Sequence, residues 1–241
     1  MVSMVEVAST DAVWWSLFTL FTAAGLLLAG TVTLIFFYLI YKYRYKPGSG
    51  ADEGREEIKP GRIYVETPAR GSSRLLLLFT GIIVMSLIVA TFDETIYLER
   101  TPVDDAFVVW VTGFQFGWEF EYMVDGQTLR YINYLVLPTD TVVEFKVTSR
   151  DVFHTFGFAE FKTKIDAIPG VVNSMWIKTP DEPGVYKAYC YELCGVGHSL
   201  MVGEVIIVDK DEFFRAYEAG PEAFKQFVDN VIAEYRRGGL E

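Results

Sequence analysis

The feature that most constrains this chain is an uncharged run of thirty residues near its start, residues 12–41. In a helix these residues would rise about 1.5 Å each and extend roughly 45 Å, more than the ~30 Å hydrocarbon core of a bilayer. Trp14 and Trp15 lie at one end and four tyrosines at the other, as in the aromatic belts of membrane helices. The run is too long, and its N-terminal flank too acidic, for a cleaved signal peptide. The sequence therefore predicts a membrane-spanning helix over residues 12–41.

A second uncharged run covers residues 75–92 and is bracketed by Arg74 and Asp93. This length is near the lower limit for crossing a bilayer, so a buried core helix is the alternative, but the sharp charged boundaries favour a second span. The segment between the runs, residues 42–74, carries eight Lys and Arg residues, whereas the stub before the first run carries none. The positive-inside rule then makes this segment a cytoplasmic loop and places both termini outside. Residues 1–99 are thus expected to form a transmembrane hairpin.

The outer part of the chain, residues 100–208, is built from short alternating or β-branched runs separated by turn residues. Residues 142–148 are one such run, and Pro169-Gly170 is one such break. This pattern predicts a small antiparallel barrel or sandwich. After Asp209 apolar residues recur every three or four positions, which predicts an amphipathic helical tail over residues 209–241 that packs on the barrel or on a partner.

The charge of the outer part limits its partners. The chain as a whole carries a net charge of −11, and 13 basic against 25 acidic residues after residue 92 give 13 − 25 = −12 for residues 93–241. This balance argues against nucleic acid and favours a basic protein partner. Asp151 and Asp166 are candidates for docking such a partner, with steering that salt would weaken.

The chemistry of the chain is concentrated in one short segment. The chain has two Cys and two His, and Cys190, Cys194 and His198 lie within nine positions. Met201 follows them, and His154 comes after the predicted strand 142–148. A disulfide would leave the nearby His and Met unexplained, and a structural zinc site has no use for a thioether. A mononuclear blue-copper site needs only one Cys, so one thiolate would be in excess.

Two thiolates that bridge two copper ions account for the whole set of donors. Each copper then takes one imidazole, from His154 or His198. Met201 and the backbone carbonyl of Glu192 suit the remaining weak axial positions. The residues therefore favour a binuclear copper centre that carries electrons.

Three segments resemble subunit II of cytochrome c oxidase. The motif Cys-x-Glu-x-Cys-Gly-x-x-His-x-x-Met at residues 190–201 is similar to the CuA loop of that family. The runs Ser-Arg-Asp-Val-Phe-His at 149–154 and Lys-Ile-Asp-Ala-Ile-Pro-Gly at 164–170 resemble the same family. The resemblance implies an all-β, cupredoxin-like Greek-key barrel behind a two-helix transmembrane hairpin, with a C-terminal helical tail.

The resemblance also implies a function. Subunit II of a haem–copper oxygen reductase accepts electrons from an external carrier and passes them to the haems of subunit I, where O₂ becomes water and protons are translocated. This chain would then be the electron-transfer subunit in a cell (plasma) or equivalent respiratory membrane, without the oxygen-reducing site itself. The Glu192 side chain would reach a magnesium site completed by subunit I. Cytochrome c, a blue-copper protein or a bound cytochrome are the expected donors.

Two positions depart from the family pattern. The aromatic patch of the family commonly reads Gly-x-Gln-Trp-Tyr-Trp, and this chain has Gly-Phe-Gln-Phe-Gly-Trp at residues 113–118. Phe116 thus replaces the Trp at which electrons enter, and Phe116 and Trp118 are candidates either for electron uptake or for ordinary core packing. Residues 74–78 contain no acid, so a proton-channel role does not carry over to the second span. A CuA subunit of a nitric oxide reductase and a membrane-anchored copper-delivery protein stay open as alternative functions.

Overall fold

The computed structural model describes residues 8–44 and 70–238. Most of the expected cytoplasmic loop 42–74 therefore lies outside the described residues, as do residues 1–7 and 239–241. The chain divides into two compact units, one formed by residues 17–92 and the other by residues 1–16 with 93–241.

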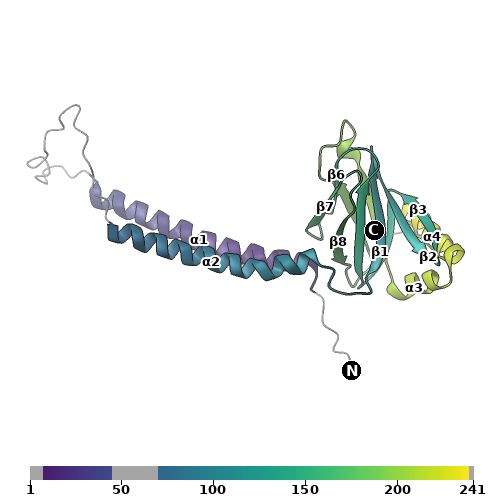
Figure 1. The fold of residues 1–241 in the computed structure, drawn as a ribbon, viewed down its shortest axis with the longest axis horizontal. Coiled ribbons are helices and arrows are strands. Elements are labelled where there is room, and N and C mark those ends of the chain that lie inside the picture. Colours follow the sequence, from purple (N-terminus) through teal and green to yellow (C-terminus); the bar gives the residue numbers. More distant parts are fainter. Residues whose placement is uncertain (1–7, 45–69, 239–241) are drawn as a thin grey trace, which may run out of the picture. The chain divides into compact units, whose positions relative to one another are not determined.

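The first unit consists of two long helices, α1 (Thr10–Tyr43) and α2 (Arg70–Glu99), drawn purple to blue in Figure 1. Both are long and apolar enough to cross a membrane. Their apolar side chains are exposed on every side, and Leu34 and Leu77 are each 73% exposed. A helix that is hydrophobic all round needs an apolar environment, which agrees with the two predicted membrane helices. α2 continues to Glu99, beyond the predicted limit at residue 92, because a charge marks the edge of a bilayer without ending a helix.

The second unit is a sandwich of two five-stranded sheets, one with strand order β3-β2-β1-β5-β8 and the other with β4-β10-β9-β6-β7. An all-β, cupredoxin-like domain behind two apolar helices confirms the predicted fold class. The strands are β1 (Phe107–Phe114), β2 (Gly117–Val124), β3 (Gln127–Ile132), β4 (Tyr134–Pro138), β5 (Val142–Ser149), β6 (His154–Phe158), β7 (Thr163–Ala167), β8 (Asn173–Lys178), β9 (Gly184–Cys190) and β10 (Val202–Val208).

The sheets are mixed, so the expectation of purely antiparallel pairing was wrong. β1 pairs with β5 in parallel, with Gly113 opposite Ser149, and β4 pairs with β10 in parallel. The reason is the route of the chain. It leaves the first sheet after β3, contributes β4 to the second sheet, and returns as β5 beside β1, so the two neighbours run the same way.

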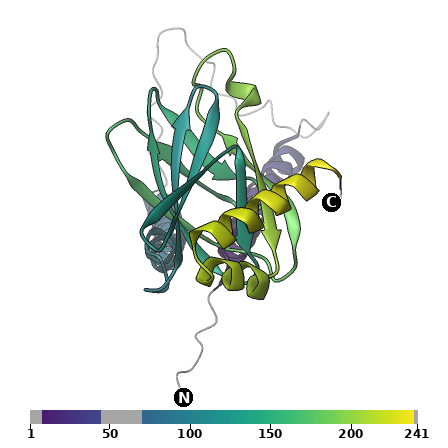
Figure 2. The same cartoon turned by 90° about the vertical axis from the view of Figure 1, so that its right-hand side faces the viewer.

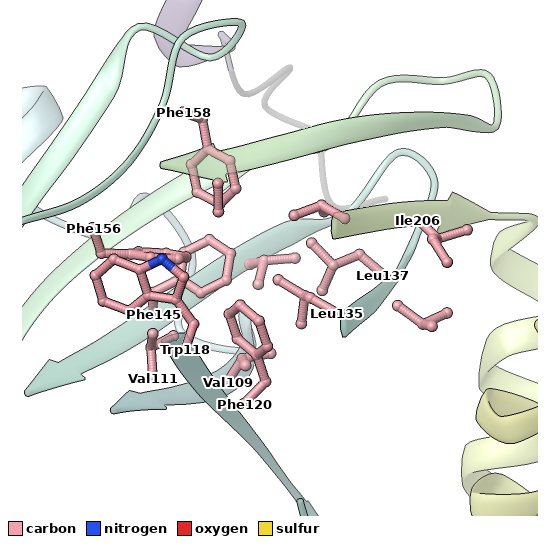
Figure 3. Close-up of a cluster of buried hydrophobic side chains, with 14 of the residues drawn as sticks. Val109, Val111, Trp118, Phe120, Leu135, Leu137, Phe145, Phe156, Phe158 and Ile206 are labelled. Carbon is pink, nitrogen blue, oxygen red and sulfur yellow. The ribbon is translucent and has the colours of Figure 1, made fainter. Parts of the chain in front are cut away.

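The core lies between the sheets and is rich in aromatic rings (Figure 3). Inward and outward residues alternate along β1 and β5, as a strand with one buried face requires. Phe145, Phe156 and Trp118 form a cluster in which Phe156 contacts Phe145 at 5.5 Å and Trp118 at 5.0 Å between ring centroids. The Tyr122 hydroxyl ties the sheets together, because it donates to the Val136 carbonyl at 2.9 Å and accepts from the Val136 amide at 2.8 Å.

The tail forms α3 (Lys210–Glu218) and α4 (Pro221–Arg236), which pack on β3 and β4 (Figure 2). Asp209 caps α3 by accepting hydrogen bonds from the backbone amides of Asp211 and Glu212. Between the helices Gly220 has φ +99°, a value that favours glycine. Phe213 and Phe224 are fully buried in the same core as the strands. The tail helices therefore complete the hydrophobic core of the sandwich.

The first turn of α1 and the last turns of α2 also belong to the second unit. Thr10 donates from its hydroxyl to the Phe161 carbonyl at 2.7 Å, and Tyr97 donates to the Ala8 carbonyl at 2.9 Å. The Tyr97 ring also meets Trp176 edge-on at 5.4 Å. Phe161 follows the C-terminal end of β6, whereas His154 is the first residue of that strand.

Candidate metal centre

Three loops meet at one end of the sandwich because of the strand registers. The β1–β2 turn contributes residues 115–116, the β5–β6 loop residues 150–153, and the β9–β10 loop residues 191–201. Gly113 lies opposite Ser149 and Phe156 lies opposite Cys190, so the strand ends from which these loops extend are neighbours in the sheets. The loops bring together residues that are up to 86 positions apart, from Gln115 to Met201.

His154 is the first residue of β6 and is fully buried. Its Nε2 lies 2.9 Å from Oδ1 of Asp151, and its Nδ1 lies 3.8 Å from Sγ of Cys190. The carboxylate is an acceptor, so Nε2 carries the proton and Nδ1 is left with a lone pair directed to the sulfur. Partial burial alone would raise the pKa of Asp151, but hydrogen bonds from His154 and from the amides of Gln115 and Val152 outweigh it and hold the pKa below its usual range.

The two cysteines are buried and face each other, with 3.9 Å between their sulfur atoms. A disulfide needs about 2.05 Å, so in this structure both thiols are free. Sγ of Cys190 also lies 3.2 Å from the carbonyl oxygen of Glu192. Burial, with Cys190 close by, raises the pKa of the Cys194 thiol to about 11. A metal that binds here must therefore displace protons from the thiols.

His198 and Met201 complete the loop on the side of Cys194. Nδ1 of His198 lies 3.7 Å from Sγ of Cys194, and Sδ of Met201 lies 3.8 Å from the same atom. His198 begins the single turn of 3₁₀ helix η1 (His198–Leu200), and Met201 follows it with 1% of its surface exposed. The turn reverses the chain so that His and Met both face the sulfur.

The donor set fits soft metal ions. With metal–sulfur and metal–nitrogen distances of about 2.3 and 2.0 Å, donors around one tetrahedral ion lie roughly 3.3–3.8 Å apart. The neighbouring Cys, His and Met donor atoms of this site are 3.7–3.9 Å apart, and the donor atoms of His154, Cys190 and Cys194 all lie within 4.8 Å of one another. Two thiols, two imidazoles and a thioether are ligands that select copper over hard ions such as magnesium or calcium. The structure thus brings together all the donor residues that the sequence singled out.

The four remaining candidate residues lie around this set. Trp118 is fully buried, with its ring centroid 6.0 Å from that of His154, whereas Phe116 is half-buried beside the β9–β10 loop. Asp166 is exposed and accepts a hydrogen bond from the Thr155 hydroxyl at 2.8 Å. Asp151, besides its contact with His154, accepts from the backbone amide of Gln115 at 2.7 Å.

Sequence reasoning missed two features of the site. Gln115 donates from its side-chain amide to the Cys194 carbonyl at 2.5 Å, a contact over 79 positions that no local motif announces. Asp151 was considered only as a surface charge, although an acid three residues before a ligand His is a signal for a supporting hydrogen bond. Both residues tie the ligand loops to each other.

Comparisons with known proteins give a consistent result. A sequence profile described as cytochrome c oxidase subunit II, periplasmic domain, matches residues 120–209. The chain is 63% identical over 236 residues to heme-copper oxidase subunit 2 of Aeropyrum pernix, an alignment that covers 96% of this chain and 100% of that protein. It is 35% identical over 190 residues to cytochrome c oxidase subunit 2 of Alkalihalophilus pseudofirmus, over 76% of this chain and 51% of that protein, so it spans about half the length of this relative.

Among solved structures, the periplasmic domain of subunit II of the cytochrome oxidase of Bradyrhizobium japonicum is similar, with a TM-score of 0.46 and 30% identity. That match covers 52% of this chain and 99% of the other.

Proposed function

Because this chain belongs to the family of subunit 2 of the heme-copper oxidases, we propose that its outer domain holds a binuclear copper centre of the CuA type. The centre would accept electrons from an external carrier and hand them to the haems of a partner subunit, where O₂ is reduced to water. One observation carries the proposal: two free thiols lie 3.9 Å apart, and each has its own imidazole nitrogen, at 3.8 Å for Cys190 and 3.7 Å for Cys194.

Each donor has a distinct role in this proposal. Cys190 and Cys194 would hold both ions, with His154 as a ligand on the Cys190 side and His198 on the Cys194 side. Met201 lies on the side of Cys194 and the Glu192 carbonyl on the side of Cys190, so each half of the site could supply one weak donor. When bound, the copper pair supplies a one-electron couple whose charge is shared between two ions. The imidazole of His154 and the thioether of Met201 are buried, so these two donors are shielded from water.

The two apolar helices anchor the chain in this proposal. Both cross the respiratory membrane, with residues 42–74 in the cytoplasm and the sandwich outside. In this proposal the haems and the oxygen-reducing site belong to the partner subunit. The proposal also has the Glu192 side chain, which is exposed, share a magnesium ion with that subunit.

A copper-delivery protein fits the site less well. A delivery site must release its metal readily, whereas Cys194, His154 and Met201 are buried and come from two separate loops. Such a set favours a retained metal that works by changing its oxidation state.

The metal content of the full-length protein, purified in detergent and loaded with copper, tests the proposal. We expect two copper atoms per chain in the wild type. In Cys194→Ser, which leaves one bridging sulfur, we expect the pair to be lost. One copper per wild-type chain, or an unchanged pair in the variant, would overturn the binuclear assignment.

A further inference from the structure

Gln115 is attached to both halves of the candidate site. Its backbone amide donates to Oδ2 of Asp151 at 2.7 Å, and the other carboxylate oxygen of Asp151 lies 2.9 Å from Nε2 of His154. Its side-chain amide donates to the carbonyl of Cys194 at 2.5 Å. A backbone carbonyl can only accept, so the NH₂ group of the amide must face it. One residue therefore joins the His154 loop to the Cys194 loop.

The ligand loop lies directly on this residue and its neighbour. A Cβ atom at Gly195 would come within 3.0 Å of Nε2 of Gln115, and one at Gly197 within 2.5 Å of the Phe116 ring. Gly195 also has φ +128°, which glycine adopts most readily. The loop thus approaches as closely as it does because these two positions lack side chains. Gln115 supports the loop next to Cys194, and Phe116 supports it next to His198.

We propose that Gln115 is a positioning residue that sets the spacing between the His154 and Cys194 halves of the metal site. The inference rests on the proposed copper function. The pairing of β6 with β9, and the hydrogen bond from the Tyr191 amide to the Thr155 carbonyl at 2.9 Å, already hold Cys190 next to the His154 strand. Cys194 lies four residues beyond the end of β9, so its distance from His154 depends on contacts made by the loop itself. The hydrogen bond to the Cys194 carbonyl fixes the peptide from which the Cys194 side chain projects. The bond to Asp151 fixes the carboxylate that orients the His154 ring.

Hydrogen bonds that support metal ligands in other proteins indicate how much copper affinity the loss of the Gln115 contact should cost. Loss of one such hydrogen bond commonly lowers metal affinity by about 10- to 100-fold, because a ligand that is free to move binds less well. A shift in donor spacing also changes how evenly two ions share an electron. Gln115 should therefore affect the spectrum and the potential of the centre as well as its affinity for copper.

The test uses the full-length, copper-loaded protein and three variants. Gln115→Met keeps the length of the side chain and removes the donor, and Gln115→Glu keeps its shape but places an acceptor against the Cys194 carbonyl. Gln127→Met is the matched control, because Gln127 is exposed on β3. The measurements are the rate of copper loss to a chelator, the copper hyperfine pattern in EPR and the reduction potential.

We expect both Gln115 variants to lose copper roughly tenfold faster or more, with the larger effect for Gln115→Glu. Their hyperfine pattern and potential should also change, while Gln127→Met behaves as the wild type. If Gln115→Met lowers only the melting temperature and leaves copper loss, spectrum and potential unchanged, the inference is wrong. Failure of the proposed function looks different, because the wild type itself would then lack the copper pair.

Discussion

At the scale of single residues, the site is organised around two sulfur atoms with unequal surroundings. Cys190 has His154 and the Glu192 carbonyl within 3.8 Å, whereas Cys194 has His198 and Met201 within 3.8 Å. Each sulfur thus has one strong and one weak neighbour. In the proposed copper centre, this balance would let the two halves share the metal pair evenly, and the weak donors would tune its potential.

Replacing Met201 with Leu tests whether the Met201 thioether is a weak ligand of the proposed copper centre. Leu has a similar volume, so the core should tolerate the change and the protein should keep two copper ions. Loss of an electron-donating thioether disfavours the oxidised form, and we expect the reduction potential to rise. Redox titration of the optical spectrum measures this shift. An unchanged potential would remove Met201 from the set of ligands.

At the scale of elements, the carboxylate of Glu144 links β5 to β8 and to the segment before β1 through hydrogen bonds. Glu144 on β5 accepts from Lys146 at 2.7 Å, from Ser174 on β8 at 2.5 Å and from Thr101 at 3.1 Å. Burial alone would raise the pKa of Glu144, but these hydrogen bonds outweigh it and the pKa is lowered. A carboxyl group whose pKa is lowered by folding stabilises the protein at pH values above its pKa in the unfolded chain. This stabilisation is lost as the pH falls through the pKa of the folded state.

Glu144→Gln should therefore destabilise the protein near neutral pH by about 1–3 kcal/mol, because hydrogen bonds to a charged group are weakened. The difference from the wild type should shrink as the pH falls below the usual glutamate pKa of 4.5. Denaturant unfolding at several pH values measures both effects. Glu121→Gln is the control, because the partner of Glu121 is the exposed Arg130. A difference that grows on acidification would contradict the assignment.

The tail helices offer a second test at this scale. Phe224 on α4 is fully buried and contacts the rings of Tyr122 at 5.3 Å and Phe213 at 5.1 Å. Phe224→Ala should cost about 3–5 kcal/mol of unfolding free energy, because it leaves a cavity in the core. The neighbouring Lys225→Ala, on the exposed side of the same helix, should have a much smaller effect, because its ion pair with Asp229 is exposed to solvent. Equal effects of the two variants would show that α4 is not part of the core.

The elements also show what a sequence can reveal. The membrane helices and the ligand loop could be predicted because their signals are local: uncharged runs in one case, closely spaced Cys, His and Met in the other. The parallel pairs β1–β5 and β4–β10 could not, because pairing between distant strands leaves no periodic trace. The contact of Gln115 with Cys194 spans 79 positions and was missed for the same reason. Trp118 was ambiguous in sequence, and its complete burial follows from its place on the inner face of β2.

At the scale of the whole molecule, apolar and acidic residues are segregated. The apolar helices suit a membrane, and residues 93–241 carry a net charge of 13 − 25 = −12. Such a surface would attract a basic protein, such as the electron donor of the proposed function, over a distance set by the ionic strength. Asp166 is exposed near the ligand loops, which keeps it as a candidate for this docking.

Donor oxidation by the assembled oxidase should therefore slow as salt is added. Asp166→Asn should slow it a few-fold at low salt and have little effect at high salt, because the charge acts through screened attraction. Stopped-flow kinetics with a basic cytochrome as donor measures both effects. Asp181→Asn, an exposed acid next to the strand end opposite the ligand loops, is the matched control. A rate that ignores ionic strength would exclude charge-guided docking.

The most direct test of the central claim is the EPR spectrum of the copper-loaded, full-length protein after partial reduction. If two thiolates hold a pair of copper ions, a single unpaired electron is shared between them, and the hyperfine splitting arises from both nuclei. A spectrum whose splitting arises from one copper nucleus would contradict the account, and the paired thiols would then need another explanation.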